Sequence, residues 1–287
     1  MSMPATIELT RPWNCILAGL GVLVGGFIAG ESIGIAWSQA DMIRMALAFA
    51  AAALVTGGGN AVNDYCDRKI DKINRPGRPI PSGRIKDYEA LTISQILFVL
   101  GIIATIFVNV WCVLLAFANA IVLVLYAAEF KRRSLVGNVV IGYLVGSTFL
   151  FGGLVIEQLS AVGILAAMAG LSTVGRELIK DIEDMPGDRK LKMNTFPLRH
   201  GARKAAALAA AFIAAAIVFS PVPYLQRVFG WQYLVPLAAS VAVFICAAAI
   251  ILRDQKPTSA GYASLGCKIA MGFGLLAFLT GTLGLMW

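Results

Sequence analysis

The sequence is poor in charged residues, which make up only 14% of its 287 positions, whereas soluble globular domains carry about 25%. It contains one histidine, His200, so a histidine-based zinc site is not expected. Its five cysteines are scattered, mostly inside apolar runs, and none has the CxxC spacing of redox or zinc sites. The phosphate-binding pattern GxxxxGK[ST] is also missing. We therefore interpret the cysteines as small packing residues. The sequence has neither the pattern of a zinc site nor that of a P-loop NTPase.

Long apolar runs dominate instead. Hydrophobic residues account for 59% of the chain, the mean hydropathy is +0.78, and runs of about 18 or more apolar residues recur along its length. This pattern predicts an all-α, polytopic membrane protein with one integral domain over residues 1–287. The expected transmembrane helices are Trp13–Gly30, Met42–Asn63, Tyr88–Val108, Val110–Ala127, Leu135–Val155, Ala161–Lys180, Ala205–Phe219, Tyr233–Leu252 and Leu265–Met286.

The basic residues are distributed asymmetrically between the expected loops. With the N-terminus in the cytoplasm, every Lys and Arg except Arg44 and Arg227 falls on the cytoplasmic side, as the positive-inside rule requires. The membrane thus explains the net charge of +8, and we expect no nucleic-acid partner. The chain is expected in the cell membrane, and nothing in the sequence indicates a protein partner.

Acidic residues are concentrated in two segments, each at the cytoplasmic end of an expected helix. Both have the spacing i, i+4, i+7, i+11, which keeps side chains on one side of a helix. The first acidic segment carries Asn60, Asp64, Asp67 and Asp71, and the second carries Glu177, Asp181, Asp184 and Asp188. After the second segment a long polar loop is expected to run from Asp181 to Lys204.

Aligned carboxylates next to basic residues suit one kind of ligand. Mg²⁺ prefers oxygen ligands and typically bridges carboxylates to substrate phosphates, so two such segments can hold a metal–diphosphate group. Nearby cations could contact the phosphates directly: Arg68, Lys69, Lys72, Arg78, Arg176, Lys180 and Arg189. The alternative, that both segments are merely solvated helix ends, fits the matching spacing less well.

The two segments resemble the motifs of a known family. N-x-x-x-D-x-x-D-x-x-x-D, followed by R-P-x-x-x-G at residues 78–83, looks like the first motif of the UbiA-type intramembrane prenyltransferases. K-D-I-x-D-x-x-G-D, at residues 180–188, looks like their second motif. The resemblance extends over the whole chain and includes the number of expected helices.

The resemblance implies nine transmembrane helices around a central cavity, Mg²⁺ as cofactor, and a prenyl diphosphate donor. It implies catalytic roles for Asp64, Asp181 and Tyr126. The implied metal ligands are Asp64, Asp67, Asp71, Asp181, Asp184 and Asp188. The residues expected to bind substrate are Asn60, Arg68, Lys72, Lys131, Arg132, Arg176 and Lys180. The active site would face the cytoplasm.

Within that family, the wording NRPGRPIPSG and GRELIKDIEDMPGD is most similar to archaeal members that complete ether lipids. The implied reaction moves a geranylgeranyl group from geranylgeranyl diphosphate to the glycerol hydroxyl of geranylgeranylglyceryl phosphate and releases diphosphate. Candidate cations for the acceptor phosphate are Lys131, Arg132, Arg133, Arg199 and His200.

Other functions remain open on the sequence. An aromatic acceptor, either a quinone precursor or a chlorophyllide-type ring acid, would leave the same motifs in place. An ion-coupled transporter would be expected to carry ionisable residues in the middle of its membrane segments, which are nearly missing here. A CDP-alcohol phosphotransferase would carry a D-G-x-x-A-R motif, which this sequence does not have.

Overall fold

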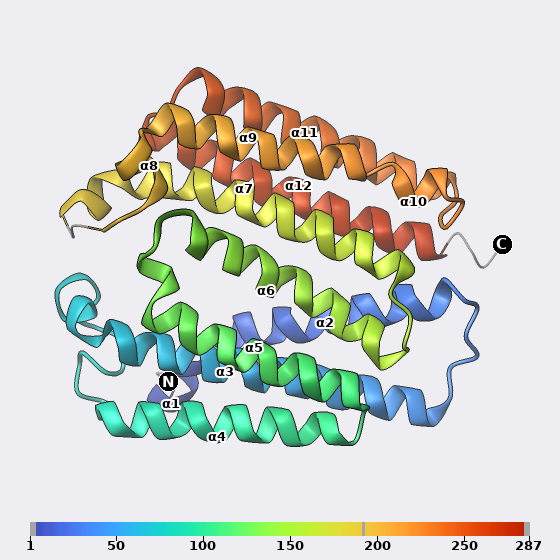
Figure 1. Cartoon of the computed structure of the whole chain (residues 1–287), viewed down its shortest axis with the longest axis horizontal. Coiled ribbons are helices and arrows are strands. Elements are labelled where there is room, and N and C mark those ends of the chain that lie inside the picture. Colours follow the sequence, from blue (N-terminus) through green and yellow to red (C-terminus); the bar gives the residue numbers. More distant parts are fainter. Residues whose placement is uncertain (1–3, 191–192, 284–287) are drawn as a thin grey trace. The chain divides into compact units, whose positions relative to one another are not determined.

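The computed structural model describes residues 4–190 and 193–283, and this part of the chain is helical throughout apart from its connections (Figure 1). The α-helices are α1 (Ala5–Thr10), α2 (Pro12–Glu31), α3 (Gln39–Asn74), α4 (Asp87–Ile106), α5 (Val110–Ala128), α6 (Ser134–Val155), α7 (Ser160–Lys190), α8 (Phe196–His200), α9 (Ala202–Phe219), α10 (Val222–Leu225), α11 (Leu234–Arg253) and α12 (Pro257–Leu283). Two short 3-10 helices, η1 (Phe130–Arg132) and η2 (Trp231–Tyr233), precede α6 and α11.

Within the described residues, nine helical segments are long and apolar enough to cross a membrane. They correspond one to one with the nine expected from the sequence, so the prediction of an all-α, multi-pass membrane protein is confirmed. The short connection between α4 and α5 is also present, at residues 107–109. The expected end of the last helix, Met286, lies outside the described residues.

The predicted polar loop after Lys180 was wrong. Helix α7 continues to Lys190 and passes through Pro186. The reason is packing: Leu178, Ile179 and Ile182 are fully buried, so the apolar face of α7 keeps its partners beyond the point where the sequence becomes charged. Proline and glycine usually end a helix, but here the tertiary contacts prevail.

The chain divides into two compact units. The first contains Met1–Phe27, Ala36–Phe130 and Thr148–Gln158, and so holds α1, α3, α4, α5, most of α2 and the end of α6. The second contains Ile28–Ile35, Lys131–Ser147 and Leu159–Trp287, and so holds the start of α6 and all of α7 to α12. The first acidic segment belongs to the first unit and the second acidic segment to the second. The expectation of a single domain over residues 1–287 stays a prediction.

In the first unit, α3 packs along α4 and α5 through small residues. The Ser94 hydroxyl of α4 donates a hydrogen bond to the Gly58 carbonyl of α3 (2.8 Å), which brings the two backbones close together. A larger residue at position 58 would crowd α4, because its Cβ would lie 3.0 Å from the Ser94 carbonyl oxygen. Small residues at helix interfaces allow such close approach in membranes.

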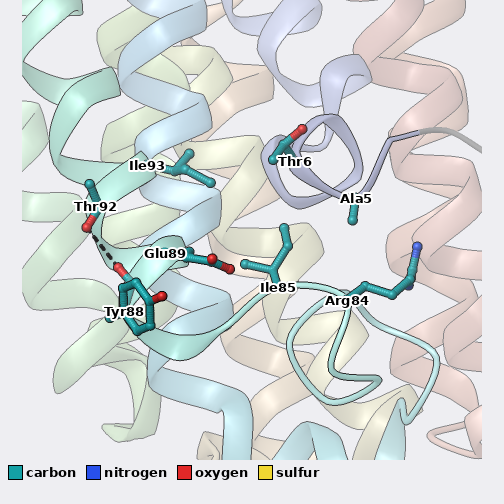
Figure 2. A pocket seen from close by; sticks show the side chains of 8 residues that line it. All are labelled: Ala5, Thr6, Arg84, Ile85, Tyr88, Glu89, Thr92 and Ile93. Atoms are coloured by element: carbon teal, nitrogen blue, oxygen red, sulfur yellow. Dashed lines mark hydrogen bonds between the residues drawn. The ribbon is translucent and has the colours of Figure 1, made fainter.

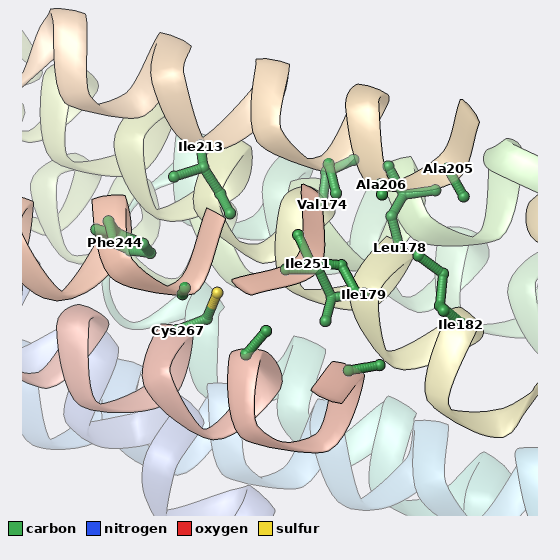
Figure 3. Packing of buried hydrophobic residues seen from close by; sticks show 14 of the residues in the cluster. Val174, Leu178, Ile179, Ile182, Ala205, Ala206, Ile213, Phe244, Ile251 and Cys267 are labelled. Carbon is green, nitrogen blue, oxygen red and sulfur yellow. The ribbon is translucent and has the colours of Figure 1, made fainter. Parts of the chain in front are cut away.

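In the second unit, α7 packs against α9 and α12, and α11 packs against α9 and α12. Figure 3 shows the resulting core. Isoleucine and leucine side chains of α7 meet alanines of α9 and α12 there, and these alanines let the helices approach closely. This packing fixes the rotation of α7 about its axis, and with it the direction in which the second acidic segment faces.

Candidate active site

The first acidic segment lies in the last turns of α3, and its three carboxylates are buried. Asp64, Asp67 and Asp71 are 5–7% exposed, although each would be charged in water. Burying an unpaired carboxylate is costly, so these side chains need partners. A solvated helix end would have left them in water, and that alternative is therefore wrong for this segment.

Two arginines supply positive charge to these carboxylates. Arg78, from the loop after α3, donates from Nη1 to Asp64 Oδ1 (3.1 Å) and to Asp71 Oδ2 (2.6 Å). Arg11 donates from Nη2 to the same Oδ1 atom of Asp64. Arg11 lies between α1 and α2 in a left-handed backbone conformation (φ 51°), and its side chain reaches Asp64 of α3. The sequence reasoning included Arg78 among the candidates but missed Arg11.

The N-terminal segment also contacts Asn60, the first residue of the motif. Asn60 Nδ2 donates to the Thr10 carbonyl oxygen (2.8 Å), and Leu9 beside it is fully buried. One turn further along α3, Asn63 Nδ2 donates to Asp67 Oδ2 (3.2 Å). Helix α1 therefore forms part of the surroundings of the first acidic segment. The only signal in the sequence was the pair Arg11-Pro12 directly before an apolar run.

The second acidic segment lies on α7, and each of three acids has a different partner. Glu177 pairs with Arg176. Asp184 pairs with Lys180 (2.8 Å), and the side chains of Asp184 and Lys180 are both about half exposed. Asp181 Oδ2 accepts a hydrogen bond from Asn138 Nδ2 of α6 (2.8 Å). Asp188, in the last turn of α7, is half-buried. Asn138 was not among the predicted site residues.

The other predicted catalytic and substrate-binding residues have the following positions and contacts. Arg68 binds Asp87 at the start of α4 (2.9 Å) and stacks over the Tyr65 ring at 4.3 Å. Lys72 is exposed on the last turn of α3. Tyr126 is half-buried in the last turn of α5, in the first unit, and Lys131 lies in η1, in the second unit. The side chain of Arg132 lies outside the described part of the structure.

The donor set fits Mg²⁺, although the carboxylates of one segment do not by themselves form a metal cage. In the described residues, no three His, Cys, Asp or Glu side chains are grouped closely enough to hold a metal. Asp64 Oδ1 and Asp71 Oδ2 both lie within hydrogen-bond distance of Arg78 Nη1 (3.1 and 2.6 Å), so a guanidinium nitrogen contacts both of these carboxylates. Mg²⁺ is usually bound by one or two carboxylates together with substrate phosphates, and each segment offers carboxylates of that kind.

A separate cavity of about 480 Å³ lies in the first unit between α1, the loop before α4 and α4 itself (Figure 2). Arg84, Tyr88 and Glu89 line it, but no predicted site residue does. Arg84 binds Glu8 through two hydrogen bonds, of 2.7 and 3.1 Å, and this interaction raises the pKa of Arg84 above its ordinary value. This ion pair ties α1 to the loop, and the cavity beside it is not the acidic site.

Comparison with known proteins places the chain in a family. A sequence model of the UbiA prenyltransferase family matches residues 16–284. The chain is 42% identical to a digeranylgeranylglyceryl phosphate synthase of Methanococcoides burtonii, covering 97% of this chain and 100% of the relative. It is 38% identical to a protein of the same name from Methanocaldococcus jannaschii, covering 97% and 96%.

Solved structures agree with this. A structure from work on digeranylgeranylglyceryl phosphate synthase in membranes has a TM-score of 0.87 at 38% identity and covers 97% of this chain and 98% of that one. A UbiA homologue from Archaeoglobus fulgidus, solved with GPP and Mg²⁺, has a TM-score of 0.67 at 14% identity over 96% and 99%, which shows a shared fold. Because the family model spans nearly the whole sequence, the chain belongs to the UbiA prenyltransferase family.

Proposed function

We propose that this chain transfers a geranylgeranyl group from geranylgeranyl diphosphate to the glycerol hydroxyl of geranylgeranylglyceryl phosphate, in the membrane and with Mg²⁺. The proposal is supported by relatives named digeranylgeranylglyceryl phosphate synthase that are 38% and 42% identical over nearly the full length. The family supports the reaction class, and the similarity to these relatives favours this acceptor.

One structural observation carries the proposal: three buried carboxylates on α3 share their site with two arginines. A diphosphate bound with metal presents both signs of charge, since its metal attracts carboxylates and its phosphate oxygens attract guanidinium groups. Asp64, Asp67 and Asp71 would hold the metal. Arg11 and Arg78 are placed to exchange their carboxylate contacts for phosphate contacts when the donor binds.

Mg²⁺, when bound, supplies positive charge that stabilises the diphosphate leaving group. The aspartates of α7 would hold metal in the same way, with Asp181 and Asp184 as the central pair. Lys180 and Arg176 lie beside them on α7 and would contact phosphate oxygens. Asn60 would contribute its amide at the start of the first segment.

The chemical step breaks the allylic C1–O bond, and its electron pair leaves with the diphosphate. The glycerol hydroxyl oxygen attacks C1 to form the ether bond, and the hydroxyl proton passes to the released diphosphate. The ring of Tyr126 would stabilise the allylic cation through its face. Apolar walls would keep out water, which otherwise captures the cation.

The acceptor phosphate requires cations of its own. Lys131, Arg132 and Arg133 follow α5, and Arg199 and His200 end α8. These residues lie on the side expected to face the cytoplasm, so we place the active site at the cytoplasmic surface of the cell membrane. Both substrates carry phosphate and long chains, and this location keeps the phosphates in water and the chains in lipid.

An acceptor panel tests the proposal. Purified protein in detergent receives Mg²⁺ and radiolabelled geranylgeranyl diphosphate together with geranylgeranylglyceryl phosphate, 4-hydroxybenzoate, a dihydroxynaphthoate or a chlorophyllide. We expect labelled product in the organic phase with the glycerol ether alone. Product with an aromatic acceptor would show that the proposed acceptor is wrong and that the reaction class, prenyl transfer, is right. No product with any acceptor, from folded protein, would contradict the proposal.

A further inference from the structure

We infer that Asn138 is a positioning residue, which holds the carboxylate of Asp181 in the orientation needed to bind metal–diphosphate. This inference rests on the proposed function, because it assigns a purpose to a contact beside the second acidic segment. The contact itself joins two different helices of one unit: Asn138 Nδ2 of α6 donates to Asp181 Oδ2 of α7 at 2.8 Å.

The contact is built on a rigid helix pair. The Cβ of a residue at Gly142 would lie 2.7 Å from the Gly170 carbonyl oxygen, and one at Gly146 would lie 2.7 Å from the Ala166 carbonyl oxygen. Backbones this close cannot slide or rotate without a clash. Asn138 sits one turn before Gly142 on the same helix, so its distance from α7 is fixed by these glycines. Functional groups held on packed helices keep their geometry better than groups on loops.

The Asn138 amide is uncharged, whereas Asp64, Asp71, Glu177 and Asp184 have cations as partners. Arg11 and Arg78 neutralise Asp64 and Asp71, and on α7 the acids Glu177 and Asp184 pair with a cation. Asn138 orients Asp181 without cancelling its negative charge. A carboxylate has about four acceptor positions, and this hydrogen bond uses one of them, so capacity remains for a metal ion.

The neighbouring groups are compatible with this role. Asn138 is 8% exposed, and a buried amide normally keeps its hydrogen bonds. Apolar residues of α7, Leu178 and Ile182, face the core, so the helix cannot rotate to give Asp181 another partner. Losing such an outer hydrogen bond typically costs 10- to 100-fold in metal affinity.

The test uses three variants of the full chain in detergent. Asn138→Leu keeps the size and removes the donor, Asn138→Ala removes both, and Asn138→Gln keeps the amide. Asn109→Ala is the matched control: Asn109 is also an amide between helices, donating to the Leu154 carbonyl oxygen (2.8 Å), but it lies at the start of α5 in the first unit. Binding of Mn²⁺ in the presence of inorganic diphosphate is measured by electron paramagnetic resonance, next to the Mg²⁺ concentration that gives half-maximal turnover.

We expect Asn138→Leu and Asn138→Ala to weaken Mn²⁺ binding and to raise the half-maximal Mg²⁺ concentration by at least about tenfold. Asn138→Gln should recover part of the loss. Asn109→Ala should lower the melting temperature and leave the Mn²⁺ binding and the half-maximal Mg²⁺ concentration unchanged. Unchanged metal readings in folded Asn138→Leu and Asn138→Ala would overturn the inference, as would equal metal losses in Asn109→Ala.

Failure of the positioning role and failure of the proposed function give different results. If the wild-type chain forms no prenyl product but its Mn²⁺ and diphosphate binding depends on Asn138, the positioning role stands and the reaction is wrong. If the wild-type chain forms product and the Asn138 variants bind Mn²⁺ normally, the reaction stands and the positioning role is wrong.

Discussion

Arg78 links Asp64 and Asp71 through a single nitrogen, which lies 3.1 Å from the nearer oxygen of the first and 2.6 Å from that of the second. The two aspartates stand two turns apart on α3, and the arginine comes from the loop after that helix. The R-P-x-x-x-G motif thus folds back over the aspartates that precede it. The two halves of the first sequence motif form one structural unit.

Removing this arginine should destabilise the protein unless metal and diphosphate replace it. Arg78→Gln leaves two buried carboxylates without their shared cation, and breaking a buried ion pair costs about 3–5 kcal/mol. We expect a lower melting temperature in EDTA and a larger rise than in wild type when Mg²⁺ and inorganic diphosphate are added. Thermal unfolding in detergent measures both.

Arg84→Gln is the control for Arg78→Gln. Arg84 comes from the same loop, but its ion pair with Glu8 is more exposed than that of Arg78 with Asp71, and exposed pairs contribute little to stability. The melting temperature of Arg84→Gln should fall little and should respond to Mg²⁺ and diphosphate as wild type does. Equal behaviour of the two variants would show that Arg78 has no special relation to the acidic segment.

The motif aspartates should be needed for turnover even in variant protein that still folds. Asp64→Asn and Asp181→Asn keep the size of each side chain and remove its charge, so we expect kcat to fall by about 100-fold or more, the scale of losing one electrostatic contact in an active site. Near-normal turnover in either variant would contradict its assignment as a metal ligand.

Asp41→Asn makes the same chemical change at the other end of α3. Asp41 accepts hydrogen bonds from the backbone and hydroxyl of Ser38 and so caps the helix. Ser38 and Asp41 form a capping box, which stabilises the first turn of α3. The variant should lose some thermal stability and keep its turnover, which separates damage to the helix from damage to the site.

Chelation should stop the reaction reversibly. EDTA would remove Mg²⁺ from the carboxylates, and added Mg²⁺ should restore the original rate because the arginine pairs keep the first acidic segment folded in the meantime. Product formation in the acceptor assay reports the loss and the recovery. Turnover that persists after thorough chelation would exclude the proposed role of the metal.

The helix contacts in the first unit make a prediction about stability alone. A Cβ at Gly152 of α6 would collide with the Val22 carbonyl oxygen of α2, so Gly152→Ala should cost about 1–3 kcal/mol through overpacking. Gly163→Ala is the matched control, since a Cβ there would meet nothing within 4 Å. Comparable melting temperatures for the two variants would contradict the close packing of α2 and α6.

The sequence predicted the parts of this protein that depend on local pattern. Apolar run lengths predicted the nine membrane helices found in the described part of the chain, and the spacing of Asp64, Asp67 and Asp71 predicted that they share one side of α3. The end of α7 was missed because Pro186 and Gly187 indicate a break locally, while the buried Ile182 keeps the helix packed. Only tertiary structure contains that information.

Partners from distant parts of the chain were the other omission. Arg11 reaches Asp64 across 53 positions and Asn138 reaches Asp181 across 43, and neither pair has a spacing that a sequence pattern could reveal. Arg68 shows the converse: it stands next to Asp67 in the sequence, yet it binds Asp87. The roles of Tyr126, Lys131 and Arg132 stay predictions.

The arginine pairs of the first acidic segment also bear on how the protein is made. A newly inserted chain must bury Asp64, Asp67 and Asp71 before it has met any substrate, and Arg11 and Arg78 give Asp64 and Asp71 their counter-charge from within the polypeptide. We therefore expect membrane insertion and folding to need no supply of magnesium, and the folded enzyme to persist in the bilayer while metal and prenyl donor are scarce.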